Sequence, residues 1–177
     1  MMDVSIIPLG SHPRDIVLTD LKDGIERTLP VRVRVEERPL DIDTALDSSR
    51  KQFHSTSVLA LMLDREDLRA QRLLGITAFD LFVPVLTFVF GQAQLNNRAA
   101  VFSTFRLHNE FYGLPRSHGL LYERALKEAL HELGHTFGLR HCLDHPCVMN
   151  SSTYVEDIDL KPPDFCLPCR EHLQNAY

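Results

Sequence analysis

The chain has 177 residues, 44% of them hydrophobic, and a formal net charge of −5. This size and composition fit one globular domain with a substantial core, and the scattered basic residues exclude the basic patch of a nucleic-acid-binding protein. The most apolar run, residues 81–90, contains Pro84 and is well short of the roughly 20 residues that span a membrane, so we expect no membrane span.

Strands and helices are predicted to alternate over the first 80 residues. The amino-terminal segment carries Asp3 and no basic stretch ahead of a long apolar one, so it does not resemble a secretory signal, and a cytoplasmic location is expected. Apolar residues then recur with the period of a strand or of a helix. The predicted strands are 4–9, 31–35 and 73–79, and the predicted helices are 15–29 and one that begins after Asp47 or Ser48 and runs through Met62.

Residues 86–93 and 99–107 are predicted as two further strands. The first, LTFVFGQA, is rich in β-branched and aromatic residues but is interrupted by Gly91. It fits either a core strand with a bulge at the glycine or an edge strand above a cleft, where it would hydrogen-bond an extended peptide. Both interpretations remain open from the sequence.

A long helix is predicted to begin at Ser117, which suits an N-cap. Its buried stripe consists of Tyr122, Leu126, Ala129, Leu130, Leu133 and Phe137. Residues 131–141 follow the pattern HExxHxxGxxH. His131 and His135 lie one turn apart on one helix face, so both imidazoles can reach one zinc ion at about 2.0–2.1 Å.

Gly138 can take a positive φ, end the helix and turn the chain so that His141 supplies a third ligand. Three histidines leave a fourth position for water, which is typical of a catalytic zinc site. Glu132 directly follows the first histidine, the place of the general base in metalloproteases. Other histidines, His12, His54, His108 and His118, lack partners at ligand spacing.

All four cysteines lie close together in the carboxy-terminal part of the sequence. They are Cys142, Cys147, Cys166 and Cys169, in the pattern C-x4-C followed by C-x2-C. In a reducing compartment this spacing favours a closed, structural zinc site of four thiolates over two disulfides. A mixed site that includes His145 or His172 is the weaker alternative.

HExxHxxGxxH with a downstream methionine is the metzincin signature. The continuation, HC-x4-C-x-M and then C-x2-C after sixteen residues, resembles the archaemetzincin family, and the match extends from His131 to Cys169. The resemblance implies an α+β, single-domain metzincin-like fold, in which helices, the active-site helix among them, pack on a mixed twisted sheet. Met149 is then similar to the Met-turn residue, an apolar floor below the three histidines that is not a ligand.

We expect one metalloprotease domain over residues 1–177. It comprises a subdomain, 1–138, that ends with the active helix, and a small zinc-bound lobe, 139–177, that holds the Met-turn and the four cysteines. The expected activity is zinc-dependent hydrolysis of peptide bonds, with two zinc ions per chain and Glu132 as general base. Its partner is a peptide or protein bound in extended form, and a monomer is favoured.

Some choices remain open from the sequence. The alternatives to peptide hydrolysis are action on another amide or ester and a zinc-stabilised binding module with a blocked site. Endopeptidase and aminopeptidase modes are both possible, because no residue clearly anchors a free amino terminus. Tyr112, Tyr122 and Tyr154 are candidates to stabilise an oxyanion, and the sequence does not choose among them.

Overall fold

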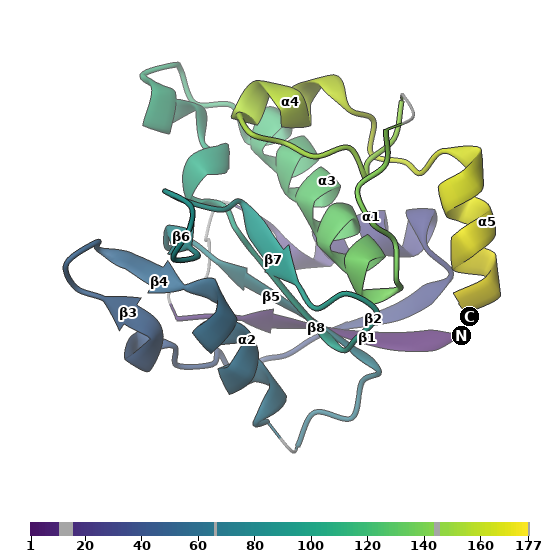
Figure 1. The fold of residues 1–177 in the computed structure, drawn as a ribbon, viewed down its shortest axis with the longest axis horizontal. Helices are drawn as coiled ribbons and strands as arrows, with labels where there is room; N and C mark the ends of the chain where they lie inside the picture. Colours follow the sequence, from purple (N-terminus) through teal and green to yellow (C-terminus); the bar gives the residue numbers. More distant parts are fainter. Residues whose placement is uncertain (11–15, 66, 144–145, 177) are drawn as a thin grey trace.

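A five-stranded sheet forms the centre of the fold, which we describe from a computed structural model over residues 1–177 except 11–15, 66, 144–145 and 177 (Figure 1). The strand order is β2-β1-β5-β8-β7. The strands are β1 (Met2–Pro8), β2 (Val31–Val35), β5 (Arg72–Thr77), β7 (Gly91–Ala93) and β8 (Ala99–Ser103). Four strands run parallel and β7 pairs antiparallel with β8, so the sheet is mixed, as the sequence resemblance implied.

Helices cover both faces of this sheet. Helices α1 (Leu18–Thr28) and α3 (His118–Thr136) pack on one face, and α2 (Ser55–Leu63) packs on the other. Successive strand residues point to opposite faces. In β1, therefore, Ile6 enters the core below α1 and α3, whereas Ile7 enters the core below α2. The mixed sheet with helices on both sides agrees with the expected α+β class.

Residues 46–54 differ from the prediction of a helix. They form β3 (Leu46–Asp47) and β4 (Gln52–His54), which with β6 (Leu81–Phe82) make a second, three-stranded sheet in the order β3-β4-β6. The carboxylate of Asp47 accepts hydrogen bonds from the backbone amides of Ser49 and Arg50, at 2.9 and 3.1 Å, and so closes a turn. Helix α2 begins only at Ser55, and the predicted helix start was wrong.

The strands predicted over 86–93 and 99–107 are both shorter in the structure. Only Gly91–Ala93 is regular, as β7. Strand β8 ends at Ser103 and is followed by two short 3-10 helices, η2 (Phe105–Leu107) and η3 (Asn109–Tyr112), while a third, η1 (Asp43–Ala45), precedes β3. Because β7 is the last strand in the sheet order, the edge-strand interpretation of this segment is confirmed.

The carboxy-terminal part of the chain packs around α3. It contains α4 (Val155–Leu160) and α5 (Leu167–Ala176), the latter next to the end of α3 in Figure 1. An ion pair of 2.7 Å between Arg124 on α3 and Asp159 on α4 joins the two helices. No helix in the described part of the chain has both the length and the apolar composition needed to cross a membrane.

Candidate metal centres and active-site cleft

Helix α3 carries two of the predicted zinc ligands and places them at the floor of a cleft. It begins at Ser117, whose hydroxyl accepts the backbone N–H of Leu120 at 3.4 Å, as predicted for the cap. It ends at Thr136, Gly138 follows with a φ of +95°, and the N–H groups of Gly138 and Leu139 bond back to the last turn. This left-handed position turns the chain toward His141.

The three histidine rings converge. Their candidate ligand atoms all lie within 4.8 Å of one another, and the ring centroids are 4.7 to 5.2 Å apart. The Nε2 atoms of His131 and His135 are 3.1 Å apart. Two nitrogen ligands on a tetrahedral zinc ion, with bonds of about 2.0–2.1 Å, lie about 3.3 Å apart. The observed separation therefore fits a shared metal ion.

Backbone carbonyl groups fix the orientation of two of these rings. His131 Nδ1 lies 2.9 Å from the carbonyl oxygen of Val148, and His135 Nδ1 lies 2.7 Å from that of Leu139. A carbonyl oxygen only accepts, so each Nδ1 carries the proton and each Nε2 presents a lone pair to its neighbour. Two facing lone pairs at 3.1 Å repel unless a cation lies between them. This arrangement suits a metal ion.

The electrostatic environment keeps the imidazoles neutral. Burial lowers the pKa of His131 well below its usual value, and the Lys161 ammonium adds to this effect. Burial also lowers the pKa of His135 and of His141. Neutral imidazole is the form that ligates metals.

Glu132 lies beside the histidine cluster but is not one of its converging groups. Burial raises the pKa of its carboxyl well above the usual value, the Glu128 carboxylate adds to this, and the Lys161 ammonium opposes it. A cation held by the neighbouring imidazoles would favour the ionised carboxylate. The side chain reaches toward β7, where a Cβ on Gly91 would lie only 2.5 Å from Glu132 Oε1. The glycine therefore makes space for this carboxylate.

The four cysteines form a second cluster. Cys142 Sγ lies 3.7 Å from Cys166 Sγ, and Cys147 Sγ lies 3.8 Å from Cys169 Sγ. These distances exclude disulfides, whose sulfur atoms are about 2.05 Å apart. Thiolates on a tetrahedral zinc ion, at about 2.3 Å each, are about 3.8 Å apart. The cluster thus has the geometry of a four-thiolate zinc site.

Of the two histidines of the alternative mixed site, only His172 lies within the described residues, and it does not belong to the converging thiol group. His145 lies outside the described residues, and His172 lies instead beside Gly138, its Nε2 3.2 Å from where a Cβ would be. Among the residues that the structure describes, this group consists of the four cysteine sulfur atoms.

One short segment connects the two clusters. Cys142 donates its backbone N–H to the carbonyl of Met149 at 3.0 Å, and Asn150 Nδ2 donates to the carbonyl of Cys142 at 2.9 Å. The same segment supplies the Val148 carbonyl that orients His131. Met149 is fully buried below α3, where its Sδ would be 2.5 Å from a Cβ on Gly134. Met149 thus packs against Gly134, in the helical turn between His131 and His135.

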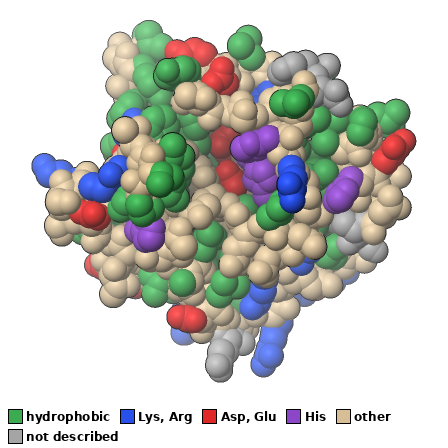
Figure 2. All heavy atoms as spheres, in the orientation of Figure 1, with side chains coloured by type: hydrophobic (Ala, Val, Ile, Leu, Met, Phe, Trp, Pro, Cys, Tyr) green, Lys and Arg blue, Asp and Glu red, His purple; other side chains and the backbone are tan. Residues whose placement is uncertain are grey.

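The cleft above the histidines has a volume of about 840 Å³ and is bounded on one side by the edge strand β7. Figure 2 shows it as a hollow in which histidine side chains lie beside acidic ones. The carbonyl of Phe90 and the amide of Gln94 bond to β8. Since bonding directions alternate along a strand, the backbone groups of Gly91 and Ala93 face the cleft.

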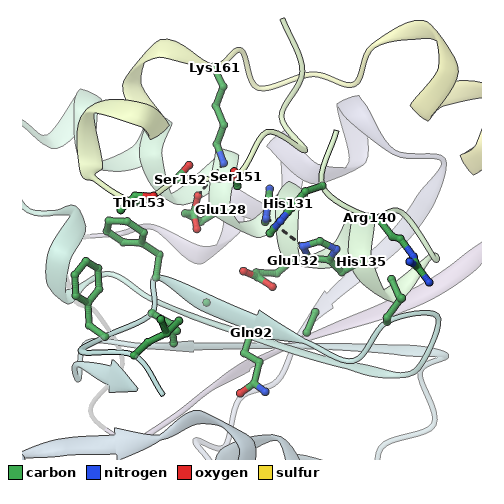
Figure 3. A pocket seen from close by; sticks show the side chains of 18 of the residues that line it. Gln92, Glu128, His131, Glu132, His135, Arg140, Ser151, Ser152, Thr153 and Lys161 are labelled. Atoms are coloured by element: carbon green, nitrogen blue, oxygen red, sulfur yellow. Dashed lines mark hydrogen bonds and ion pairs between the residues drawn. The ribbon is translucent and has the colours of Figure 1, made fainter. Parts of the chain in front are cut away.

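Several cleft residues were missed by the sequence analysis. Glu128, Lys161 and the segment 151–153 line the cleft together with the predicted residues (Figure 3). Glu128 follows the helical spacing, four residues before Glu132, and could have been found on that basis. Lys161 had no such signal, because only the tertiary fold brings it to α3.

The other residues considered from the sequence lie elsewhere. The hydroxyl of Tyr112 donates to the carbonyl of Arg106, and that of Tyr122 donates to the carbonyl of Asp20. Tyr154 is exposed and does not line the cleft. His54 bonds to Ser57, neither His108 nor His118 joins the metal-ligand groups, and His12 lies outside the described residues. None of these three tyrosines therefore emerges as an oxyanion-binding group.

Comparison with known proteins adds a consistent set of similarities. The pattern of Peptidase family M54 matches residues 17–175. The archaemetzincin of Pyrococcus abyssi is 39% identical over 176 residues, which cover 97% of this chain and 94% of the relative. That of Pyrococcus furiosus is 38% identical over 178 residues, covering 97% and 92%.

Solved structures show the same fold. The crystal structure of archaemetzincin from Methanopyrus kandleri superposes with a TM-score of 0.82 at 34% identity, covering 99% of this chain and 94% of that one. A zinc-dependent peptidase from Methanocorpusculum labreanum superposes with a TM-score of 0.80 at 28% identity, covering 96% and 99%.

Proposed function

Because the chain belongs to peptidase family M54, we propose that His131, His135 and His141 hold its catalytic zinc ion and that Glu132 is the general base. The protein is a zinc metallopeptidase, with a histidine site and a cysteine site for two zinc ions per chain. The observation that carries the residue assignment is the convergence of three imidazoles beside a free, buried carboxylate.

The imidazoles of His131, His135 and His141 would hold the zinc ion, which would supply Lewis-acid chemistry by lowering the pKa of a bound water toward about 7 and polarising the scissile carbonyl. The carboxylate of Glu132 accepts the proton of the attacking water and passes it to the leaving amine. Val148 and Leu139 hold the Nε2 lone pairs of His131 and His135 in position through their carbonyl groups. No covalent intermediate with the protein is required.

We propose that the substrate binds as an extended peptide along β7. The outward-facing backbone groups of Gly91 and Ala93 support this, because an added strand forms main-chain hydrogen bonds with a free sheet edge. Such bonds tolerate many side chains. They also place the peptide between β7 and the histidine cluster, where the scissile carbonyl lies opposite Gly91 and Glu132.

We assign the second zinc ion a structural role, held by Cys142, Cys147, Cys166 and Cys169 in a lobe formed by residues 139–177. Four ligands complete a tetrahedral site and leave no position for water. The thiol cluster, with no disulfide between the described cysteines, fits a reducing compartment, and we propose a cytoplasmic location on that basis.

A library of peptides with free and with acetylated amino termini tests the function. We expect cleavage that disappears with a chelator and returns with zinc, and the blocked peptides separate endopeptidase from aminopeptidase action. Glu132→Ala should keep both zinc ions and lose about 10²–10⁴-fold in rate. Glu123→Ala, an exposed glutamate on the same helix, is the matched control. Full activity of Glu132→Ala would refute the assignment.

A further inference from the structure

A buried ion pair lies in the wall of the cleft. Lys161 Nζ is 3.2 Å from Glu128 Oε1, and the two residues are only 5% and 3% exposed. Lys161 Nζ also donates to the carbonyl of Asn150 at 3.3 Å. Figure 3 shows Lys161 reaching down to Glu128 beside Ser152, on the side of the cleft away from Arg140. All these side chains border the space that a substrate would occupy.

The polar groups of this pair are not fully satisfied within the protein. Glu128 Oε1 is buried and meets the lysine as an ion pair without a hydrogen bond, and the buried Ser152 Oγ has no hydrogen-bond partner among the described residues. A buried ion pair generally contributes little to stability compared with apolar residues of the same size, and unsatisfied buried polar groups cost free energy. Such groups in a cleft point to a ligand that completes them.

The direction of the bound peptide places this pair relative to the cleaved bond. Gly91 of β7 faces Glu132, and the N–H of Asn96 donates to the carbonyl of His135 at 2.9 Å. Strand β7 and helix α3 therefore run in the same direction past the cleft. We take the substrate to pair antiparallel with β7, the slightly more stable of the two pairings, so that its carboxyl end points toward residues 86–90. Glu128 lies four residues before Glu132, about 6 Å along the helix in that direction.

We infer that Glu128, Lys161 and Ser152 select the side chain of the first residue after the cleaved bond, and that they prefer a neutral amide, as in glutamine or asparagine. The inference rests on the proposed peptidase function. An amide carbonyl accepts from the lysine while its NH2 group donates to the carboxylate. An acidic side chain is repelled by the Glu128 carboxylate, and a basic side chain is repelled by the Lys161 ammonium. An apolar side chain removes water from both charged groups without supplying new hydrogen-bond partners.

Binding of metal-directed ligands tests this independently of turnover. Two succinyl hydroxamates are titrated calorimetrically into the zinc-loaded protein. The side chain next to the zinc-binding group is that of glutamine in one ligand and that of its near-isostere methionine in the other. We expect the glutamine form to bind at least about tenfold more tightly, because a site built to hydrogen-bond a ligand rejects the analogue that lacks the group. Equal or tighter binding of the methionine form, or of forms with glutamate or lysine side chains, overturns the inference.

A double variant identifies the residues responsible. Glu128→Leu with Lys161→Met removes both charges at similar volume, which avoids leaving one charge unpaired. It should reverse the preference toward the methionine form. The matched control is Arg124→Met with Asp159→Leu, which removes the other ion pair between α3 and α4, outside the cleft, and should leave the preference unchanged.

A glutamine preference that persists in the double variant would overturn the assignment of these residues. If the double variant does not fold, the affinities of the two ligands for the wild-type protein still show whether the glutamine form is preferred. Ser152→Ala should then reduce the difference between these two affinities. A preference without peptide cleavage would contradict the proposed function and with it the link to a cleaved bond, whereas peptide cleavage without the preference would overturn this inference alone.

Discussion

Replacing Gly91 by alanine tests how closely the general base is positioned. The φ angle of Gly91 is not in the left-handed region, so the backbone accepts alanine. The added Cβ would lie 2.5 Å from Oε1 of Glu132 and 2.8 Å from its Cγ, where ordinary contact begins at 3.4 Å. The carboxylate oxygen must therefore retreat by the difference of about 0.9 Å, and because the Cγ is also too close, rotation of the tip alone does not relieve the clash.

A misplacement of about 1 Å in a catalytic group can cost about 100-fold in rate. We expect Gly91→Ala to lower kcat/KM on a fluorogenic peptide by about that factor. Zinc content should stay at the wild-type level, because the three atoms nearest to the added Cβ all belong to Glu132 and none to a histidine. Gly119→Ala, where an added Cβ meets no atom within 4 Å, is the control. Wild-type turnover by Gly91→Ala would refute the argument.

Two further predictions concern the cysteine cluster and the α1–β2 contact. Cys166→Ser should lower both the melting temperature and the zinc occupancy of the histidine site. The control is Leu167→Ser at the exposed neighbouring position, which should change neither quantity. Two zinc ions per chain of the Cys166→Ser variant by elemental analysis, with an unchanged melting temperature, would contradict this prediction. The pKa of Glu26 is lowered by a hydrogen bond from Lys22 and, to a smaller extent, by one from the backbone amide of Val33. The ionised Glu26 therefore stabilises the fold above its pKa in the unfolded chain, about 4.3, and this contribution is lost as the pH falls through its lower pKa in the folded protein. Glu26→Gln should therefore be less stable than the wild type in urea at pH 7, with a difference that shrinks in acid; a constant difference across pH would oppose the explanation.

The histidine and cysteine sites were predictable because their spacing is local. His131 and His135 belong to one helix, and Gly138 provides the turn that the third ligand needs. The cysteines lie in two pairs whose separations suit a tetrahedral ion. In both cases the chemistry depends on residues near each other in the sequence, so periodicity and spacing carry the information.

Features that depend on distant contacts were not predictable in this way. The helix start predicted after Asp47 or Ser48 rested on the spacing of Phe53, Val58, Leu59 and Met62. Gln52, however, is buried and donates a 2.8 Å hydrogen bond to Asp80, which is far along the chain. Val85 belongs to the most apolar run of the sequence yet is 89% exposed, near the rim of the cleft that Leu86 lines. The pairing of Lys161 with Glu128 likewise exists only once α4 has packed on α3.

The adjacency of His141 and Cys142 joins the histidine cluster to the thiol cluster through a single peptide unit. The loop that presents the Val148 carbonyl to His131 is tied down by Cys147, one residue earlier in the chain. Ordering of the thiol cluster therefore also holds the carbonyl group that orients one of the histidine rings.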